Sequence, residues 1–163
     1  MAEALQRVGR GEILDRAAMS ATMDEIMAGA CDDRQIAGLL MGMAARGEHL
    51  EEIVGAAMAM RRVVHRIVAR RQPLLDTCGT GGSGVPRRNV STAAAIAVAA
   101  CGVGVAKHGN RGASSPCGSA DLLEAVGVDL GLSAEQIGAS IDRLGIGFCF
   151  APALHPAMRH AAS

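Results

Sequence analysis

Aromatic side chains are almost missing from this 163-residue chain, which has no tryptophan or tyrosine and only Phe148 and Phe150. Half of the residues are nonetheless hydrophobic, so a core must be built from closely packed Ala, Leu, Ile, Val and Met. Net charge is also absent, because 16 basic residues balance 16 acidic ones. A general nucleic-acid binder draws most of its affinity from a strongly basic face, so the balanced charge argues against that function.

Long apolar runs and paired cysteines are lacking as well. No uninterrupted apolar run reaches the roughly 18–20 residues that span a bilayer, and residues 1–10 lack the apolar core of a signal peptide. The five cysteines are odd in number and form no C-x-x-C pair, which argues against a disulfide framework or a zinc site. We therefore expect buried thiols in a reducing cytoplasm and no membrane association.

The first part of the chain has helical periodicity from residue 1 to residue 70. Asp32 or Asp33 is expected to cap one helix, which Gly47 ends, and residues 51–70 form a longer helix. Cations cluster near the end of this longer helix, at Arg61, Arg62, His65, Arg66, Arg70 and Arg71. They suit the negative end of a helix dipole, and we interpret them as a solvated helix end rather than an anion site.

After Pro73 the pattern changes to strands that alternate with helices. Short strands are predicted over 74–78, 103–107 and 146–150, and helices over 91–101, 119–126 and 133–144. Ser119 is expected to cap the second of these helices, and Ser133 to open the third through a capping box. Such alternation is typical of a parallel α/β sheet. The sequence therefore predicts an α + α/β fold, with an all-helical bundle in residues 1–71 and an α/β domain in residues 73–163.

Two glycine-containing loops follow the first two predicted strands. Residues 76–92 read DTCGTGGSGVPRRNVST, and residues 107–115 read KHGNRGASS. Ligands of open α/β sheets gather at the carboxyl ends of the strands, so both loops should face one site. Glycines let backbone N–H groups approach an anion, and the helix that begins near Ser91 presents its positive end. With Lys107 as a point charge and Arg111 as a planar fork, the pair predicts a phosphate site, where a hydroxyl could also ligate Mg²⁺.

Neither loop matches a standard phosphate fingerprint. The first is not G-x-G-x-x-G with a ribose-binding acid, and it does not end in the Gly-Lys-Ser/Thr of a P-loop. A glycine-rich turn alone is weak support, but Lys, His, Asn and Arg within five residues of a strand end favour function. We interpret His108 as orienting its loop or exposed, rather than as a general base, since no carboxylate is placed to tune it. Cys78 has no base paired with it in the sequence, so no nucleophile is assigned.

An ordered series of motifs covers nearly the whole chain: residues 35–41 (QIAGLLM), 76–82 (DTCGTGG), 89–95 (NVSTAAA), 107–111 (KHGNR), 114–115 (SS), 118–121 (GSAD), 145–148 (GIGF) and 151–158 (APALHPAM). In this series the chain resembles the anthranilate phosphoribosyltransferase family of tryptophan biosynthesis. The resemblance implies an α/β domain of the nucleoside phosphorylase/phosphoribosyltransferase type. It also implies a cytoplasmic homodimer, formed through the helical domain.

The resemblance implies a reaction in which anthranilate attacks phosphoribosyl pyrophosphate and Mg²⁺-bound pyrophosphate leaves. By position, the substrates would be bound by Gly79, Gly82, Ser83, Asn89, Val90, Ser91, Thr92, Lys107, His108, Gly109, Asn110, Arg111, Gly112, Ala113, Ser114, Ser115 and Ser119. Ser91 would also contact Mg²⁺, and Asn110 with Gly79 would line the anthranilate site. The family needs little acid–base catalysis, so no catalytic acid or base is assigned, and Lys107, Asn110 and Arg111 would act by positioning.

Departures from the family pattern keep two alternatives open. Ser83 stands where an aspartate is usual, Arg87-Arg88 replace a common Thr-Phe, and Pro116 and Cys117 are also unusual. The chain is about half the family's usual length on the ordinary domain scale. It ends before an arginine expected at the anthranilate site and an Asp-Glu pair that carries Mg²⁺, so we expect poor activity from the chain alone. A non-catalytic dimerisation and phosphate-binding module is one alternative. A nucleoside phosphorylase is disfavoured, because Asp-Thr-Cys-Gly stands in place of its Lys-His-Ser.

Overall fold

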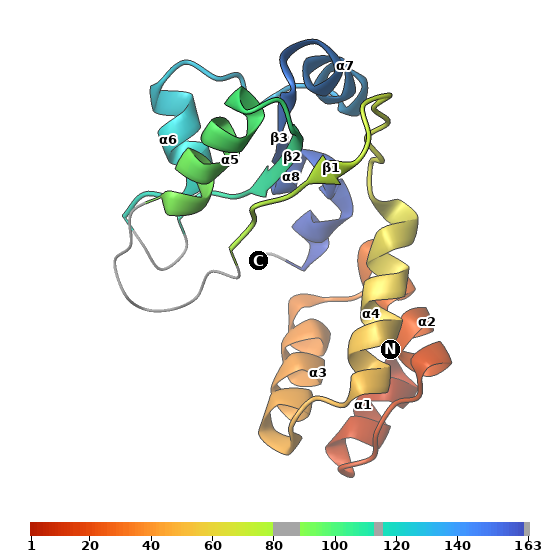
Figure 1. Cartoon of the computed structure of the whole chain (residues 1–163). Helices are drawn as coiled ribbons and strands as arrows, with labels where there is room; N and C mark the ends of the chain where they lie inside the picture. The colour runs from red at the N-terminus through yellow and green to blue at the C-terminus, as the bar shows by residue number, and fades with distance from the viewer. Residues whose placement is uncertain (80–88, 113–115, 162–163) are drawn as a thin grey trace. The chain divides into compact units, whose positions relative to one another are not determined.

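The computed structural model describes residues 1–79, 89–112 and 116–161, and the chain divides into two compact units (Figure 1). The helical unit joins Met1–Val64 to the chain from His155 onward, and the α/β unit is His65–Leu154. The expected boundary at residues 71–73 lies a few residues after this division, and the chain after Leu154, expected in the α/β domain, packs with the helices. The predicted fold class, a helical bundle followed by a parallel α/β domain, is confirmed.

Local capping signals set the ends of the helices in the helical unit. Its elements are α1 (Ala2–Gly9), α2 (Arg16–Met27), α3 (Asp33–Arg46), α4 (Leu50–Val63) and the 3-10 helix η1 (Pro156–His160). The Asp15 carboxylate accepts a hydrogen bond from the Ala18 N–H at 2.8 Å and begins α2. Asp32 and Gln35 close a capping box at the start of α3, and Gly47, with φ of 90°, ends that helix. The caps expected at Asp32 and Gly47 are therefore confirmed.

One apolar cluster holds the helical unit together. Its buried members are Ala4, Val8, Leu14, Met19, Met23, Ile26, Met27, Ile36, Leu39, Met43 and Ala59. Ala157 and Met158 of η1 pack against the same cluster. Gly55 of α4 lets α2 approach closely, since a Cβ there would collide with the carbonyl oxygen of Arg16. Thin side chains and a glycine contact thus replace the missing aromatics, as the composition predicted.

The long helix predicted to reach Arg70 ends at Val63 instead. Val64 is already extended, with φ of −71° and ψ of 140°. Further on, the backbone N–H groups of Arg70 and Arg71 donate to the Asp142 carboxylate at 2.8 and 3.0 Å. These donors are satisfied by a side chain far along the sequence rather than by helical carbonyls. The basic residues beyond Val63 therefore do not form a helix end.

A three-stranded parallel sheet forms the centre of the α/β unit. Its strands are β1 (Leu74–Leu75), β2 (Gly104–Gly109) and β3 (Ile146–Phe150), in the spatial order β1-β2-β3. Leu75 pairs with Val105, and β2 pairs with β3 from Val105↔Ile146 to Gly109↔Phe150. All three predicted strands are present, although β1 is shorter than expected. Because the strands are parallel, their carboxyl ends meet at one edge of the sheet.

The helices described in the α/β unit are α5 (Val90–Ala100), α6 (Ser119–Ala125), α7 (Ala134–Leu144) and α8 (Ala151–Leu154). Ser133 opens α7 through the predicted capping box. The cap predicted at Ser119 is wrong, because Gly118 is the N-cap of α6 and Ser119 is its first helical residue. A Cβ at Gly118 would collide with the backbone of residues 110–112, so only glycine fits this cap.

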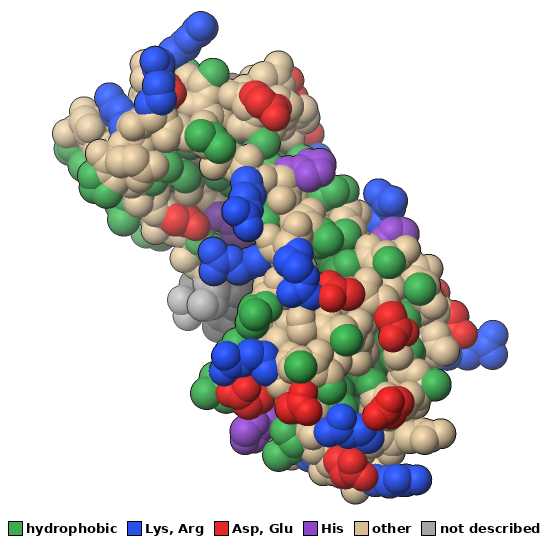
Figure 2. Space-filling view, turned by 90° about the vertical axis from the view of Figure 1, so that its right-hand side faces the viewer, with side chains coloured by type: hydrophobic (Ala, Val, Ile, Leu, Met, Phe, Trp, Pro, Cys, Tyr) green, Lys and Arg blue, Asp and Glu red, His purple; other side chains and the backbone are tan. Residues whose placement is uncertain are grey.

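The surface carries charges of both signs. On the face drawn in Figure 2, Lys and Arg side chains lie next to Asp and Glu side chains, as the balanced composition leads one to expect. Among the described residues, no helix is both long enough and apolar enough to cross a membrane.

Candidate functional site

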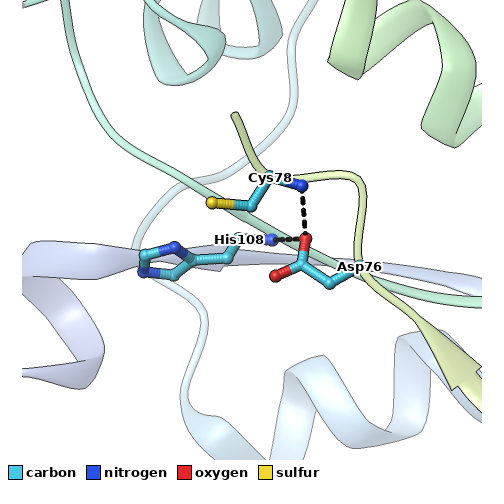
Figure 3. A group of neighbouring side chains, drawn as sticks. All are labelled: Asp76, Cys78 and His108. Carbon is cyan, nitrogen blue, oxygen red and sulfur yellow. Dashed lines mark hydrogen bonds between the residues drawn. The ribbon is translucent and has the colours of Figure 1, made fainter. Parts of the chain in front are cut away.

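Asp76 joins the ends of the first two strands. One of its carboxylate oxygens, Oδ1, accepts a hydrogen bond from the Cys78 N–H at 2.9 Å and another from the His108 N–H at 3.2 Å (Figure 3). The first bond folds the chain into a tight turn directly after β1, and the second fixes that turn to β2. The two loops singled out in the sequence are therefore tied together where their strands end.

Lys107 is a buried cation at the carboxyl end of β2. Its side chain is 2% exposed, and its ammonium donates one hydrogen bond, to the His108 carbonyl oxygen at 2.9 Å. An ammonium has three donors, and in the described part of the chain no carboxylate lies within ion-pair distance of this one. Buried charges are normally paired. The ammonium therefore retains capacity for an anionic partner.

The surroundings of Lys107 also affect Cys149 of β3, which pairs with His108 of β2. Burial raises the pKa of the Cys149 thiol to about 11, the nearby Asp76 charge adds to the increase, and Lys107 opposes it. Cys149 is thus a neutral thiol at neutral pH. We assign it to the packing behind the strand ends rather than to chemistry.

The first turn of α5 contributes hydroxyl groups. The Thr77 hydroxyl donates to the Ser91 carbonyl oxygen at 2.8 Å, which joins the β1 loop to this helix. Thr92 is 1% exposed, and its Oγ1 has no hydrogen-bond partner among the described residues. A buried hydroxyl without a partner costs stability, so its presence at a helix N-terminus that faces the strand ends is typical of a binding site.

Asn89 links this helix to α6. It is the N-cap residue of α5, but its side chain makes no capping bond. Its amide instead donates to the Gly118 carbonyl oxygen at 3.4 Å and to the Cys117 sulfur at 3.5 Å. The N-termini of α5 and α6 are therefore held close together. The start of α6 is already capped by its own Asp121 carboxylate, so the positive end that can act on an anion is that of α5.

The loop after β2 packs against the start of α6. The Asn110 carbonyl oxygen accepts from the Ala120 N–H at 3.1 Å and from the Ser119 hydroxyl at 3.3 Å. Gly109 is closely surrounded, because a Cβ there would collide with Ser119 and Phe148. The loop has no room for a side chain at this point, so the glycine is a packing requirement as well as a flexible position.

Arg111 is held by two carboxylates. Its guanidinium donates to Asp121 at 3.0 Å and to Glu124 at 2.7 and 2.9 Å, and it lies 5.8 Å from the centre of the Phe150 ring. Hydrogen bonds from Arg111 lower the pKa of Glu124, and those from Glu124 and Asp121 raise the pKa of Arg111. The fork predicted to hold phosphate therefore holds α6 in this structure.

Asp121 organises the same loop from inside α6. Its Oδ2 accepts from the Gly112 N–H at 2.9 Å and from the Gly118 N–H at 2.8 Å. These two bonds, followed by the bond from Arg111, lower the pKa of Asp121. Sequence reasoning included Asp121 only as the last residue of the 118–121 motif and gave it no role. Its position three residues after a glycine N-cap was the available signal.

The structure thus brings together Asn89, Ser91, Thr92, Lys107, His108, Gly109, Asn110, Arg111, Gly112 and Ser119 through linked hydrogen bonds and strand pairing. Gly79 follows the Asp76 turn with open space around it, and Val90 is exposed at the start of α5. The predicted residues Gly82, Ser83, Ala113, Ser114 and Ser115 lie outside the described residues. Sequence reasoning assigned no role to Asp76. An aspartate in a loop commonly accepts a hydrogen bond from the backbone N–H two residues further on, and this was the available signal for its side-chain turn.

The α/β unit also has a surface hollow. It has a volume of about 440 Å³ and is lined by residues that include His65, Arg66, Ser133 and Glu135. None of the strand-end residues described above lines it. Because its lining also includes Ala153 and Leu154 but no residue of the two glycine-containing loops, we do not assign the predicted phosphate chemistry to it.

Both units match known domains of one family. Residues 2–64 match the helical bundle domain of the glycosyl transferase family, and residues 71–163 match its a/b domain. The chain therefore belongs to this glycosyl transferase family.

Within that class, the chain is similar to anthranilate phosphoribosyltransferases. It is 53% identical to that of Ectopseudomonas mendocina, over 98% of the chain and 46% of the relative. The crystal structure of the Thermus thermophilus enzyme has a TM-score of 0.89 at 49% identity, over 98% of the chain and 48% of that protein. The chain spans about half the length of the relatives it matches. The Saccharomyces cerevisiae enzyme, in complex with PRPP and Mg, shares the fold with a TM-score of 0.83 at 24% identity, over 99% of the chain and 50% of that protein.

Proposed function

We propose that the chain binds phosphoribosyl pyrophosphate and contributes to its transfer onto anthranilate. The observation that carries this proposal is Lys107, a buried ammonium with a single carbonyl partner at the carboxyl end of β2. Buried cations without a carboxylate are costly unless an anion completes them. The N-terminus of α5, which Asn89 links to the residue before α6, adds a positive end that favours an anionic ligand. Phosphoribosyl pyrophosphate is an anion that such a site accommodates.

Residue roles follow from position. Lys107 and the N–H groups at the start of α5 would bind phosphate oxygens, and Thr92 would use its unpartnered hydroxyl there. Arg111 would act through its bonds to Asp121 and Glu124, which hold the loop that contains Asn110. Asn110 and Gly79 would line the anthranilate side. Little acid–base catalysis is needed in this scheme: the positioned amine attacks as the bond to pyrophosphate breaks, pyrophosphate leaves as a stabilised anion, and the new secondary amine releases its extra proton to solvent.

Magnesium fits the hydroxyl donors of this site. Mg²⁺ prefers oxygen ligands and usually keeps several waters while it bridges substrate phosphates. Ser91 and Thr92 offer such oxygens at the N-terminus of α5. The buried Thr92 hydroxyl has no hydrogen-bond partner among the described residues, which supports the binding of a polar ligand in this region. We propose that Ser91 contacts the ion. When bound, Mg²⁺ would neutralise charge on the departing pyrophosphate.

We propose that a second copy of the chain packs against the helical unit. Its surface exposes several large apolar side chains on α3 and α4, namely Leu40, Met41, Leu50, Ile53 and Met58. Apolar groups of this size usually mark an interface when they lie together. The five free cysteines are compatible with a reducing cytoplasm, which we propose as the location. Light scattering at rising protein concentration would test the dimer, and a constant monomer mass would contradict it.

The transfer itself is tested in a chimera. The corresponding first half of the Thermus thermophilus enzyme is replaced by this chain, and loss of anthranilate fluorescence is followed with phosphoribosyl pyrophosphate and Mg²⁺. We expect loss that requires all three components and that falls at least about tenfold in Lys107→Met, because a charged hydrogen bond contributes about 1.5–3 kcal/mol. The same chimera is assayed for phosphate-dependent cleavage of a pyrimidine nucleoside. Cleavage without anthranilate consumption would identify a nucleoside phosphorylase, and neither activity in a folded chimera would contradict the proposal.

A further inference from the structure

Three potential metal ligands converge beside the site. One ligand atom each from Asp76, Cys78 and His108 lies within 4.8 Å of the other two. In Figure 3 the Cys78 sulfur, the His108 ring and the free carboxylate oxygen of Asp76 point to the same side of the strand ends. Asp76 and Cys78 are exposed and His108 is half-buried, so an ion from solvent can reach the group.

Backbone pairing explains why these residues meet. Leu75 of β1 pairs with Val105 of β2, so the turn that follows β1 starts beside β2. The Asp76 Oδ1 atom then fixes Cys78 and His108 by accepting their N–H groups. Its other oxygen is left facing the group. Oriented ligands of this kind bind a metal at a lower entropic cost than mobile ones.

We propose that Asp76, Cys78 and His108 form a binding site for a borderline divalent transition metal such as Zn²⁺ or Co²⁺. A thiolate, an imidazole and a carboxylate are the ligand types that Zn²⁺ uses, and together they are uncommon for Mg²⁺ or Ca²⁺. The thiolate and the carboxylate carry two negative charges, which balance the ion. Three protein ligands leave a fourth tetrahedral position for water or a substrate oxygen.

Binding would change the protonation of Cys78. In this structure its thiol donates to the Gly79 carbonyl oxygen at 3.4 Å. The metal replaces the thiol proton, which is released to solvent, and the Gly79 carbonyl loses that donor. The cysteine pattern alone spoke against a zinc site because no C-x-x-C pair exists. The site escapes that argument because its ligands come from the loop after β1 and from β2, and they include only one cysteine.

The proposed metal is distinct from the Mg²⁺ that would accompany the diphosphate. Mg²⁺ would be held by hydroxyl and phosphate oxygens near α5, whereas this site contains sulfur and nitrogen ligands. Metal binding at Asp76, Cys78 and His108 is therefore expected whether or not the chain takes part in phosphoribosyl transfer. The two proposals fail separately.

Co²⁺ is a suitable probe because a cobalt–thiolate bond absorbs in the near ultraviolet. The purified chain is titrated with cobalt chloride under reducing, oxygen-free conditions, and Zn²⁺ is then added. We expect a thiolate band that saturates at one ion per chain and disappears with Zn²⁺. Cys78→Ser should lose the band, whereas Cys101→Ser, which changes an exposed cysteine at the end of α5, should keep it. His108→Gln should weaken binding by at least about tenfold, since loss of even a supporting group around a metal typically costs about 10–100-fold.

Circular dichroism and a urea midpoint for each variant separate loss of metal from loss of fold. A band that persists unchanged in folded Cys78→Ser would overturn the proposal, because another thiol would then bind the ion. Absence of any band in the folded wild-type chain at millimolar Co²⁺ would overturn it as well.

Discussion

The two units of this protein bury charged groups in opposite ways. In the helical unit Glu52 is fully buried, and its carboxylate accepts from the N–H groups of Leu14 and His49 and from the Arg46 guanidinium at 2.7–3.0 Å. In the α/β unit Lys107 is almost as deeply buried, but it has one carbonyl partner. Glu52 is therefore complete without a ligand, whereas Lys107 is not.

The number of partners of a buried charge distinguishes a structural role from a binding role more clearly than its burial or its residue type does. A buried charge with a full set of partners stabilises the arrangement around it and is costly to remove. A buried charge with few partners lowers stability in the free protein and gains its partner on binding. The helical unit thus satisfies its buried charge internally, whereas we propose that the α/β unit completes its own with an anion.

The largest expected effect is on the helical unit. Glu52→Ala leaves two backbone N–H groups and Arg46 without their acceptor, so the free energy of unfolding should fall by about 3–5 kcal/mol. Urea unfolding followed by circular dichroism measures this loss. Glu51→Ala is the matched control, because it removes a neighbouring carboxylate whose ion pair with Arg16 is exposed, and its effect should be much smaller. Equal losses in the two variants would remove the contrast between the units.

Lys107→Met should leave the stability of the protein unchanged or raise it, in contrast to Glu52→Ala. The substitution keeps the apolar stem of the side chain and removes a buried ammonium that has one partner among the described residues. Replacing such a group by an apolar one of similar volume is often neutral or stabilises by about 1–4 kcal/mol. The urea midpoint should therefore stay or rise. A loss as large as that of Glu52→Ala would show that Lys107 is a structural charge.

Thr92→Val tests the hydroxyl at the start of α5. Valine has nearly the same shape and lacks the buried Oγ1 that has no partner among the described residues. Stability should change by less than about 1 kcal/mol, because no hydrogen bond is lost in the free protein. Affinity for the Mg²⁺–phosphoribosyl pyrophosphate complex should fall about fivefold, the value of one neutral hydrogen bond. Unchanged affinity would exclude this hydroxyl from the site.

The smallest effect is expected from acidification, which changes the stability of the helical unit through Glu52. Burial by itself would raise the pKa of Glu52, but hydrogen bonds from Leu14, Arg46 and His49 outweigh it and lower the pKa. A lowered pKa in the folded state stabilises the fold above the unfolded value of about 4.3, and this stability is lost as pH falls through the folded pKa. The urea midpoint of the wild type should therefore drop on acidification below about pH 4.3. Glu52→Gln should show a flatter drop, and parallel curves would contradict this reading.

Features with local causes could be predicted from the sequence, and those with distant causes could not. The caps at Asp32, Gly47 and Ser133 depend on residues within one turn and were found. The end of α4 was misplaced, because the backbone after it is bound by Asp142, about half the chain away.

The same rule applies to the site. Lys107 and Asn89 were predicted because their residue types at strand and helix ends are informative by themselves. Asp76 received no role, because its function depends on the pairing of β1 with β2. The fork of Arg111 was predicted as a phosphate ligand from its chemistry, but the carboxylates that hold it come from α6. Residue chemistry therefore led to the candidate site, and the structure shows which of its side chains are already bound within the protein.

Calorimetric titration with phosphoribosyl pyrophosphate and Mg²⁺ tests the central claim most directly. We predict a saturable heat for the wild-type chain, retained in the Glu51→Ala control and weakened about 10–100-fold in Lys107→Met, as expected for loss of a charged hydrogen bond. Circular dichroism confirms that each variant is folded. Equal affinity of wild type and Lys107→Met, or no saturable heat in a folded wild-type chain, would contradict the claim that this buried ammonium is kept for an anionic ligand.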